Sequence, residues 1–346
     1  MQNNYYNSDQ HGAYQCFQLG DLALTRGGVL PAASLAYSTH GELNKAGSNA
    51  ILFPVMFSGT SGSLKHYIAS GLALDPDKYF IVVPNQLGNG LSSAPHNTPA
   101  PNHMANFPQL AIADDVRAQK QLCDHLGITS IELVTGWSMG AQQTYEWAIR
   151  YPDLVKRIAP IAGTAKCTPH NQLYVDVFCE ALRSDPAWQE GEYQTSQQVS
   201  TGLKRLANVF ALMGVCTEFY KQEQWRTIGF NSKAEFLVGF WQAWFAPMDP
   251  NALLAMADKW QYGDSSAAYG YDLSKALGRI NAKTKVIAFA HDMFFPVQDC
   301  RAESELIAHS ELHILDSLWG HFTMMGLADQ DFKQINQLLS DLLADK

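Results

Sequence analysis

The pentapeptide Gly136-Trp137-Ser138-Met139-Gly140 constrains the fold of this chain more than any other stretch of its sequence. It follows an expected strand at residues 131–135 and precedes an expected helix that begins near Ala141. Small residues on both sides of a serine permit a sharp, strained turn between a strand and a helix. Such a turn would lift the Ser138 hydroxyl above a sheet, at the positive end of the helix dipole. The alternative is a glycine-rich turn with an incidental serine.

Strand and helix patterns alternate on both sides of this pentapeptide. Short apolar runs are expected to be strands that are covered on both faces. These runs are residues 51–57, 79–83, 131–135, 157–162, 286–290 and 312–315. Helical spacing marks residues 112–126 and 141–150, whereas residues 17–37 alternate as antiparallel strands do. The sequence therefore predicts an α/β fold with a mostly parallel sheet covered on both faces.

The length of 346 residues exceeds one ordinary domain of about 150 residues, but no linker or repeat divides the chain. Between residues 164 and 264 the strand pattern gives way to amphipathic helical spacing rich in Trp, Tyr and Phe. We expect this segment to be a helical cap above the carboxyl ends of the strands, where ligands of open α/β sheets bind. The expected organisation is a core over residues 1–163, the cap over 164–264 and the remaining core over 265–346.

Composition excludes several classes of protein. Apolar residues make up 47% of the chain and charged residues 16%, which supports a large buried core. The net charge of -9 argues against a nucleic-acid partner, because such binders carry a basic face. We see no secretory signal and no apolar run of the roughly 18 residues that a membrane span needs. The 6 cysteines are scattered, which predicts reduced thiols in a cytoplasmic protein and no metal site.

A serine hydroxyl needs a base to accept its proton and a third group to orient that base. In a strand-turn-helix setting of this kind the expected chain order is serine, acid, histidine. His321 lies on a loop just past the expected strand 312–315, so its ring can swing over Ser138. Asp292 follows the strand 286–290 in the same way and is the expected acid. The competing carboxylates are Asp264, Asp299 and Asp316.

Two backbone N–H groups are expected to face the negative oxygen that forms when the serine attacks a carbonyl. One belongs to Met139, directly after the nucleophile. The other comes from the loop after strand 51–57, where we favour the Phe57 amide. The side chain of Ser58 or of Thr60 is the alternative donor, and the sequence leaves that choice open.

Further motifs are spread over most of the chain. They are Leu35-Ala36-Tyr37, Gly41-Glu42-Leu43-Asn44, residues 79–85, Val116-Arg117-Ala118-Gln119, Glu146-Trp147-Ala148, Tyr151-Pro152-Asp153, Phe295-Pro296 and Gly320-His321. Together with the pentapeptide they resemble the homoserine O-acetyltransferase family of α/β-hydrolase-fold proteins. The resemblance implies that Ser138, in the turn of residues 136–140 that is called the elbow below, takes an acyl group from a thioester such as acetyl-CoA and passes it to a hydroxyl. By the same resemblance, acyl-CoA would be a substrate, no resident cofactor is implied, and a homodimer formed through the cap is expected.

By position, Ser138, Asp292 and His321 match the triad of that family, and Phe57 and Met139 match its oxyanion amides. Two departures concern the substrate. The family elbow reads Gly-Gly-Ser-Met-Gly-Gly, whereas this chain has Trp137 and Ala141 at the second and last positions. Where the family has an Arg-Phe-Asp segment whose arginine helps to hold the amino acid, this chain reads Gly239-Phe240-Trp241. An apolar replacement removes the bidentate guanidinium that suits a carboxylate.

These departures favour a substrate that is less charged than homoserine. We therefore slightly prefer a hydrolase acting on a small-molecule acyl ester or thioester over an O-acyltransferase, with a catalytically silent interaction module as the third alternative. Ser58, Trp137, Arg205 and Trp241 are the expected substrate contacts, and Arg226 is the alternative source of positive charge in the cap. Most aromatic residues of the cap are expected to form its own core or a dimer contact.

Overall fold

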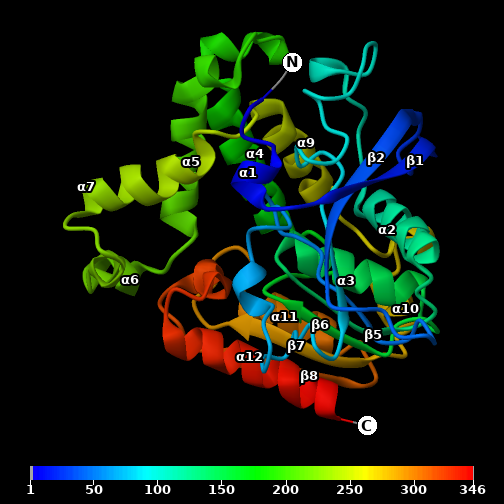
Figure 1. The fold of residues 1–346 in the computed structure, drawn as a ribbon. Helices are drawn as coiled ribbons and strands as arrows, with labels where there is room; N and C mark the ends of the chain where they lie inside the picture. Colours follow the sequence, from blue (N-terminus) through cyan, green and yellow to red (C-terminus); the bar gives the residue numbers. More distant parts are fainter. Residues whose placement is uncertain (1–2, 346) are drawn as a thin grey trace.

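The computed structural model describes residues 3–345 and has an eight-stranded sheet at its centre (Figure 1). The strands stand in the order β1-β2-β4-β3-β5-β6-β7-β8. The pairs β1–β2 and β2–β4 are antiparallel, and all other neighbours are parallel. The bounds are β1 (Gln15–Ala23), β2 (Val29–His40), β3 (Ala50–Leu52), β4 (Phe80–Pro84), β5 (Ile131–Trp137), β6 (Arg157–Ile161), β7 (Lys283–Phe289) and β8 (Ser310–Leu315). The predicted α/β fold with a mostly parallel sheet is confirmed.

Helices cover both faces of this sheet. Ile81 and Val83 of β4 belong to one apolar core, whereas Val82 between them belongs to another. The first core includes side chains of α11 (Val297–Ser304) and α12 (Asp329–Ala344). The second includes side chains of α2 (Ile112–Leu126), α3 (Met139–Arg150) and α10 (Leu273–Leu277). Because successive side chains of a strand point to opposite faces, a strand between two cores is a continuous apolar run.

The strand predicted at residues 51–57 is wrong in its length, because β3 ends at Leu52. Pro54 has no N–H to donate to a neighbouring strand, so the chain leaves the sheet there. The Gln86 side chain then binds the loop, since its Nε2 donates to the carbonyls of Val55 (2.7 Å) and Met56 (3.2 Å). The sequence pattern showed the apolar residues of this loop but not the side-chain amide that holds them.

The segment of residues 164–264, called the cap segment below, is helical. Its helices are α4 (Pro169–Arg183), α5 (Ser200–Met213), α6 (Thr217–Lys221), α7 (Lys233–Phe236), α8 (Ala243–Phe245) and α9 (Pro250–Gln261). In Figure 1 α6 and α7 project away from the sheet. The two ends of the segment meet, because Lys166 and Asp264 form an antiparallel bridge and the Cys167 N–H donates to the Gly263 carbonyl (2.7 Å). The segment therefore leaves and re-enters the core at one place.

A buried ion pair ties the cap segment to the core. Lys259 on α9 and Asp115 on α2 are fully buried and form an ion pair, and Lys259 Nζ also donates to the Leu87 carbonyl (2.8 Å). Burial lowers the pKa of Lys259 and raises the pKa of Asp115, although each charge opposes the shift of the other. Losing one partner would leave an uncompensated buried charge. The pair therefore fixes α9, which carries Trp260 towards the elbow.

Candidate active site

The sharp turn at Ser138 joins β5 to α3 and has a strained backbone. Ser138 has φ 59° and ψ -120°, in a region that side chains rarely occupy. A Cβ on Gly136 would lie 2.5 Å from the Gly140 carbonyl oxygen, and a Cβ on Gly140 would lie 2.5 Å from that of Pro54. Both positions therefore require glycine. The turn places Ser138 immediately before the N-terminus of α3, as the sequence predicts.

The structure brings His321 and Asp292 together from two segments beyond strand ends: Asp292 follows β7, and His321 lies in the 3-10 helix Gly320–Met325 after β8. His321 Nδ1 lies 2.7 Å from Asp292 Oδ2, and both residues are buried. The other carboxylate oxygen, Oδ1, accepts from the N–H groups of Phe294 (2.7 Å) and Phe295 (3.0 Å). Because an ionised carboxylate only accepts hydrogen bonds, Nδ1 is the donor in this bond, and Nε2 is the nitrogen left to accept a proton.

Two of the three competing carboxylates, Asp264 and Asp316, have other partners. Asp316 has an 84% exposed side chain and binds His291 Nε2 (3.0 Å), and Asp264 pairs with Lys166.

A cysteine, Cys300, lies close to Asp292. Burial raises the pKa of the Cys300 thiol well above its usual value, and the carboxylate of Asp292 adds to this shift. The sulfur is therefore a neutral thiol and a poor competitor for the role of nucleophile.

Side-chain amides shape the backbone on the two sides of Ser138. Gln143 Nε2 donates to the carbonyls of Val55 and Met139, both at 3.2 Å, and so bridges the loop after β3 to the first residue of α3. The Met139 N–H has no acceptor within its helix. Within residues 3–345, the Phe57 N–H also has no protein acceptor. The sequence pattern did not single out Gln143 or Gln86 as residues of the site. The spacing of polar residues does not distinguish a buried glutamine from one on a helix surface.

Ser138 and His321 line one small, largely aromatic cavity. Its other walls come from the loop after β3, the elbow, the cap segment and the loops that carry Asp292 and His321. These lining residues are Met56, Phe57, Ser58, Trp137, Phe210, Trp244, Trp260, Phe294 and Phe322. The centre of a water molecule can move within about 20 Å³ of this cavity. This volume gives room for about one or two waters. The lining holds no lysine or arginine among the residues that the structure describes.

Comparison with known proteins places this site in a family. A family model described as the alpha/beta hydrolase fold matches residues 55–326. The chain belongs to the alpha/beta hydrolase fold family. It is similar to an ethyl acetate hydrolase of Pseudomonas veronii, with 47% identity over 99% of each chain. A solved structure of the acetyl esterase MekB, also 47% identical, superimposes with a TM-score of 0.98 over 99% of this chain and 100% of that one.

The predicted resemblance to homoserine O-acetyltransferases is also confirmed within this alpha/beta hydrolase family. The enzyme of that name from Zymomonas mobilis is 31% identical over 84% of this chain and 84% of its own length. The relatives named as esterases are thus more similar to this chain than that transferase. Their names support the predicted preference for a hydrolase.

Two of the four predicted substrate contacts lie in the cavity of this alpha/beta hydrolase. Ser58 and Trp137 line it. Arg205 does not, because its guanidinium lies at the surface and donates to the hydroxyl (2.7 Å) and carbonyl (3.0 Å) of Ser184. Trp241 is also outside the lining, because its ring is buried against Phe322, with ring centroids 4.6 Å apart. The structure therefore places Arg205 and Trp241 outside the lining of the cavity that contains Ser138.

Other cavity residues were not singled out from the sequence as substrate contacts. Trp244 and Trp260 belong to the aromatic set of the cap, and Phe210 and Phe294 complete the walls. Phe294 lies against the His321 ring with centroids 4.5 Å apart. Helical spacing shows that an aromatic residue is buried but not which neighbour it faces. Only the three-dimensional packing of the side chains shows that these residues line the cavity and that Trp241 does not.

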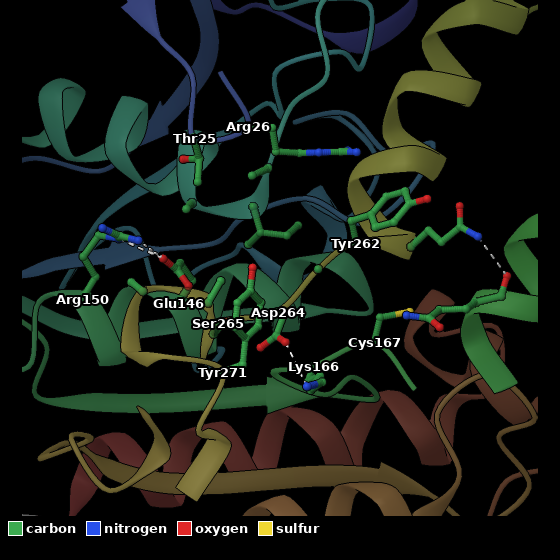
Figure 2. A pocket seen from close by; sticks show the side chains of 18 residues that line it. Thr25, Arg26, Glu146, Arg150, Lys166, Cys167, Tyr262, Asp264, Ser265 and Tyr271 are labelled. Atoms are coloured by element: carbon green, nitrogen blue, oxygen red, sulfur yellow. Dashed lines mark hydrogen bonds and ion pairs between the residues drawn. The ribbon is translucent and has the colours of Figure 1, made fainter. Parts of the chain in front are cut away.

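Figure 2 shows a second cavity. It has a volume of about 570 Å³ and shares no lining residue with the first. It lies beside the later turns of α3, which contribute Glu146 and Arg150. Burial raises the pKa of Glu146, although the Arg150 charge opposes this shift. The cationic side chains of this cavity already have carboxylate partners. The ion pairs are Arg150–Glu146, Lys166–Asp264 and Arg26–Asp258. The larger cavity therefore presents balanced charge. Of the residues considered for the site, only the competing carboxylate Asp264 lines it, and none of the predicted triad, oxyanion or substrate-contact residues does.

Proposed function

We propose that this protein is a serine esterase that hydrolyses small esters with a short acyl group, acetyl above all. One observation carries the proposal: Ser138 shares a small aromatic cavity with His321, whose ring is fixed by Asp292. An ethyl acetate hydrolase that is 47% identical over nearly the whole chain supports the substrate class. The same proposal makes Ser138, His321 and Asp292 the catalytic triad.

In the proposed reaction, His321 Nε2 takes the proton of Ser138 Oγ as this oxygen attacks the ester carbonyl carbon. The N–H groups of Phe57 and Met139 hold the negative oxygen of the tetrahedral intermediate. The bond to the alcohol oxygen then breaks, and the alcohol leaves with the proton from His321. Water gives a proton to His321 and attacks the acyl-serine, and the carboxylic acid leaves as Ser138 Oγ regains its proton.

The size of the cavity predicts a strong dependence on the length of the acyl chain. Added methylene groups in a well-packed space cost about 1–3 kcal/mol, so we expect kcat/KM to fall about 10- to 100-fold from p-nitrophenyl acetate to p-nitrophenyl butyrate. Steady-state kinetics with the two esters measure this ratio. Phe210→Leu replaces a large side chain of the cavity wall with a smaller one and so enlarges the cavity. We expect this variant to have a smaller ratio of the kcat/KM for the acetate to that for the butyrate. Equal turnover of acetate and butyrate by the unmodified protein would contradict the proposed acyl specificity.

Transfer to a hydroxyl is the second candidate function, and the 31% identity to a homoserine O-acetyltransferase favours it. Against it stands the absence of an arginine or lysine from the described cavity lining, because a carboxylate acceptor such as homoserine would lack a charged partner there. We expect homoserine and serine at millimolar concentration to leave the deacylation rate within about twofold of its value in water. The measurement is release of p-nitrophenol after the acylation burst, with methanol as a neutral acceptor. A saturable acceleration by homoserine would identify a transferase.

We further propose a homodimer formed through the cap segment and a cytoplasmic location. Leu212 and Val238 support the dimer, because these apolar side chains of the cap segment are 71% and 59% exposed. The six cysteines are free thiols, five of them buried, which supports a reducing compartment. Within residues 3–345, the structure contains no helix with the length and apolar character of a membrane span.

A further inference from the structure

A side-chain hydrogen bond joins the cap segment to the loop after β3. Trp244 on α8 donates from Nε1 to Ser58 Oγ at 3.0 Å, although 186 residues separate the two in the chain. Both side chains line the cavity that contains Ser138 and His321. The bond therefore connects the cap segment with the residue that directly follows Phe57.

The backbone at Ser58 is strained and its surroundings are fixed. Ser58 has φ 58°, a value that favours glycine, and yet the chain carries a serine here. The carbonyls of Val55 and Met56, just before it, are held by Gln86 and Gln143. Residues in such strained conformations persist where the surrounding structure over-determines them, often at ligand-binding sites. The side chain at position 58 is therefore held at a defined place in the cavity wall.

The hydroxyl of Ser58 still has a proton to donate. Its oxygen accepts from Trp244, and within residues 3–345 its O–H has no protein acceptor. A hydroxyl is one donor with two acceptor positions, so a bond accepted from Trp244 leaves the proton free. Because Trp244 lies on one side of the Ser58 oxygen, the O–H is free to point into the cavity that this side chain lines. A donor beside the Phe57 amide meets the same substrate oxygen that this amide is proposed to hold.

We propose that Ser58 is a catalytic residue whose hydroxyl donates a third hydrogen bond to the oxyanion, and that Trp244 is the positioning residue that orients this hydroxyl. The inference rests on the proposed function of the site. It assigns a side chain to an oxyanion hole that otherwise consists of two backbone amides. It also makes the cap segment part of the catalytic machinery, because Trp244 completes the hole only when α8 lies over the loop after β3.

Single and double substitutions test this assignment with p-nitrophenyl acetate. Loss of one oxyanion donor lowers kcat by about 100-fold or more, so Ser58→Ala is expected to lower kcat by about 100-fold with KM changed less than threefold. Ser58→Gly, which suits the positive φ, is expected to show the same loss. Trp244→Phe keeps an aromatic side chain but replaces the indole and removes its N–H, and we expect a decrease in kcat of about tenfold.

The double variant Ser58→Ala/Trp244→Phe separates positioning from packing. If Trp244 acts through the hydroxyl, the double variant has the kcat of Ser58→Ala within about threefold; independent effects would multiply to about 1000-fold. Trp225→Phe is the matched control, because Trp225 is buried in the cap segment outside the cavity and its Nε1 has no partner among the described residues. This control is expected to keep full activity.

Ser58→Ala with kcat within threefold of the unmodified protein, or multiplicative effects in the double variant, would overturn the inference. Ser138→Ala, measured alongside, keeps the two proposals distinct. If Ser138→Ala is inactive while the Ser58 and Trp244 variants are fully active, the proposed esterase function is supported and only the proposal of a third oxyanion donor is refuted. If Ser138→Ala is active, the proposed function itself fails.

Discussion

Ser138→Ala is expected to lower the kcat for p-nitrophenyl acetate by about 10⁴- to 10⁶-fold, the loss that follows removal of a serine nucleophile. Without Oγ no acyl-serine can form, and the remaining rate comes only from direct attack by water, with His321 as the base and the oxyanion donors stabilising the intermediate. The substitution removes one oxygen and leaves the strained turn intact, since both flanking glycines remain. Its Tm should stay within a few degrees of that of the unmodified protein, which thermal unfolding checks.

Ser304→Ala is a matched control for this result. Ser304 is also buried and bonds Ser310 Oγ at 2.7 Å, but it lies on α11 and does not line the cavity. We expect full activity from this variant. A Ser138→Ala protein that keeps more than about 1% of the kcat would show that another group is the nucleophile. The thiol of Cys300 is a poor substitute, because burial keeps it protonated.

The core of the fold could be predicted because one-dimensional patterns report it directly. Continuous apolar runs marked the central strands, and helical spacing placed the helix at Ile112–Leu126 at the residues where the structure has it. Chain order and strand ends singled out His321 and Asp292, because loops at the carboxyl ends of parallel strands gather at one edge. The structure joins these two residues by a hydrogen bond of 2.7 Å.

The walls of the cavity could not be predicted in the same way. Trp241 and Trp244 are neighbours on one helical stretch, and both read as buried aromatic residues, yet only Trp244 reaches the cavity. The stretch Leu237–Gln242 between α7 and α8 is a π-helix, whose turn differs from that of an α-helix and changes which residues share a face. Arg205 was chosen for its charge, but burial and facing partners decide whether a charge reaches a site, and these depend on the packing of several helices.

Asp292→Asn is expected to lower kcat by about 10⁴-fold while the protein stays folded. Oδ1 of residue 292 accepts two backbone N–H groups, from Phe294 and Phe295, and an asparagine oxygen can keep both bonds. The amide nitrogen must then face His321 Nδ1 in place of Oδ2. Because this nitrogen donates, it favours the tautomer with the proton on Nε2, which cannot accept the Ser138 proton. Asp292→Ala is a poorer test, since it would leave buried N–H groups unpaired and destabilise the loop.

Asp316→Asn is the matched control, because Asp316 also follows a strand and binds a histidine, His291, but at the surface. We expect its kcat within about twofold of that of the unmodified protein. Steady-state kinetics of both variants over a range of pH measure the comparison. A tenfold or smaller loss for Asp292→Asn, together with a large loss for Asp316→Asn, would transfer the acid role to Asp316. The buried bond between His321 and Asp292 argues for the opposite result, because a carboxylate shielded from water holds an imidazolium far more strongly than one that is 84% exposed.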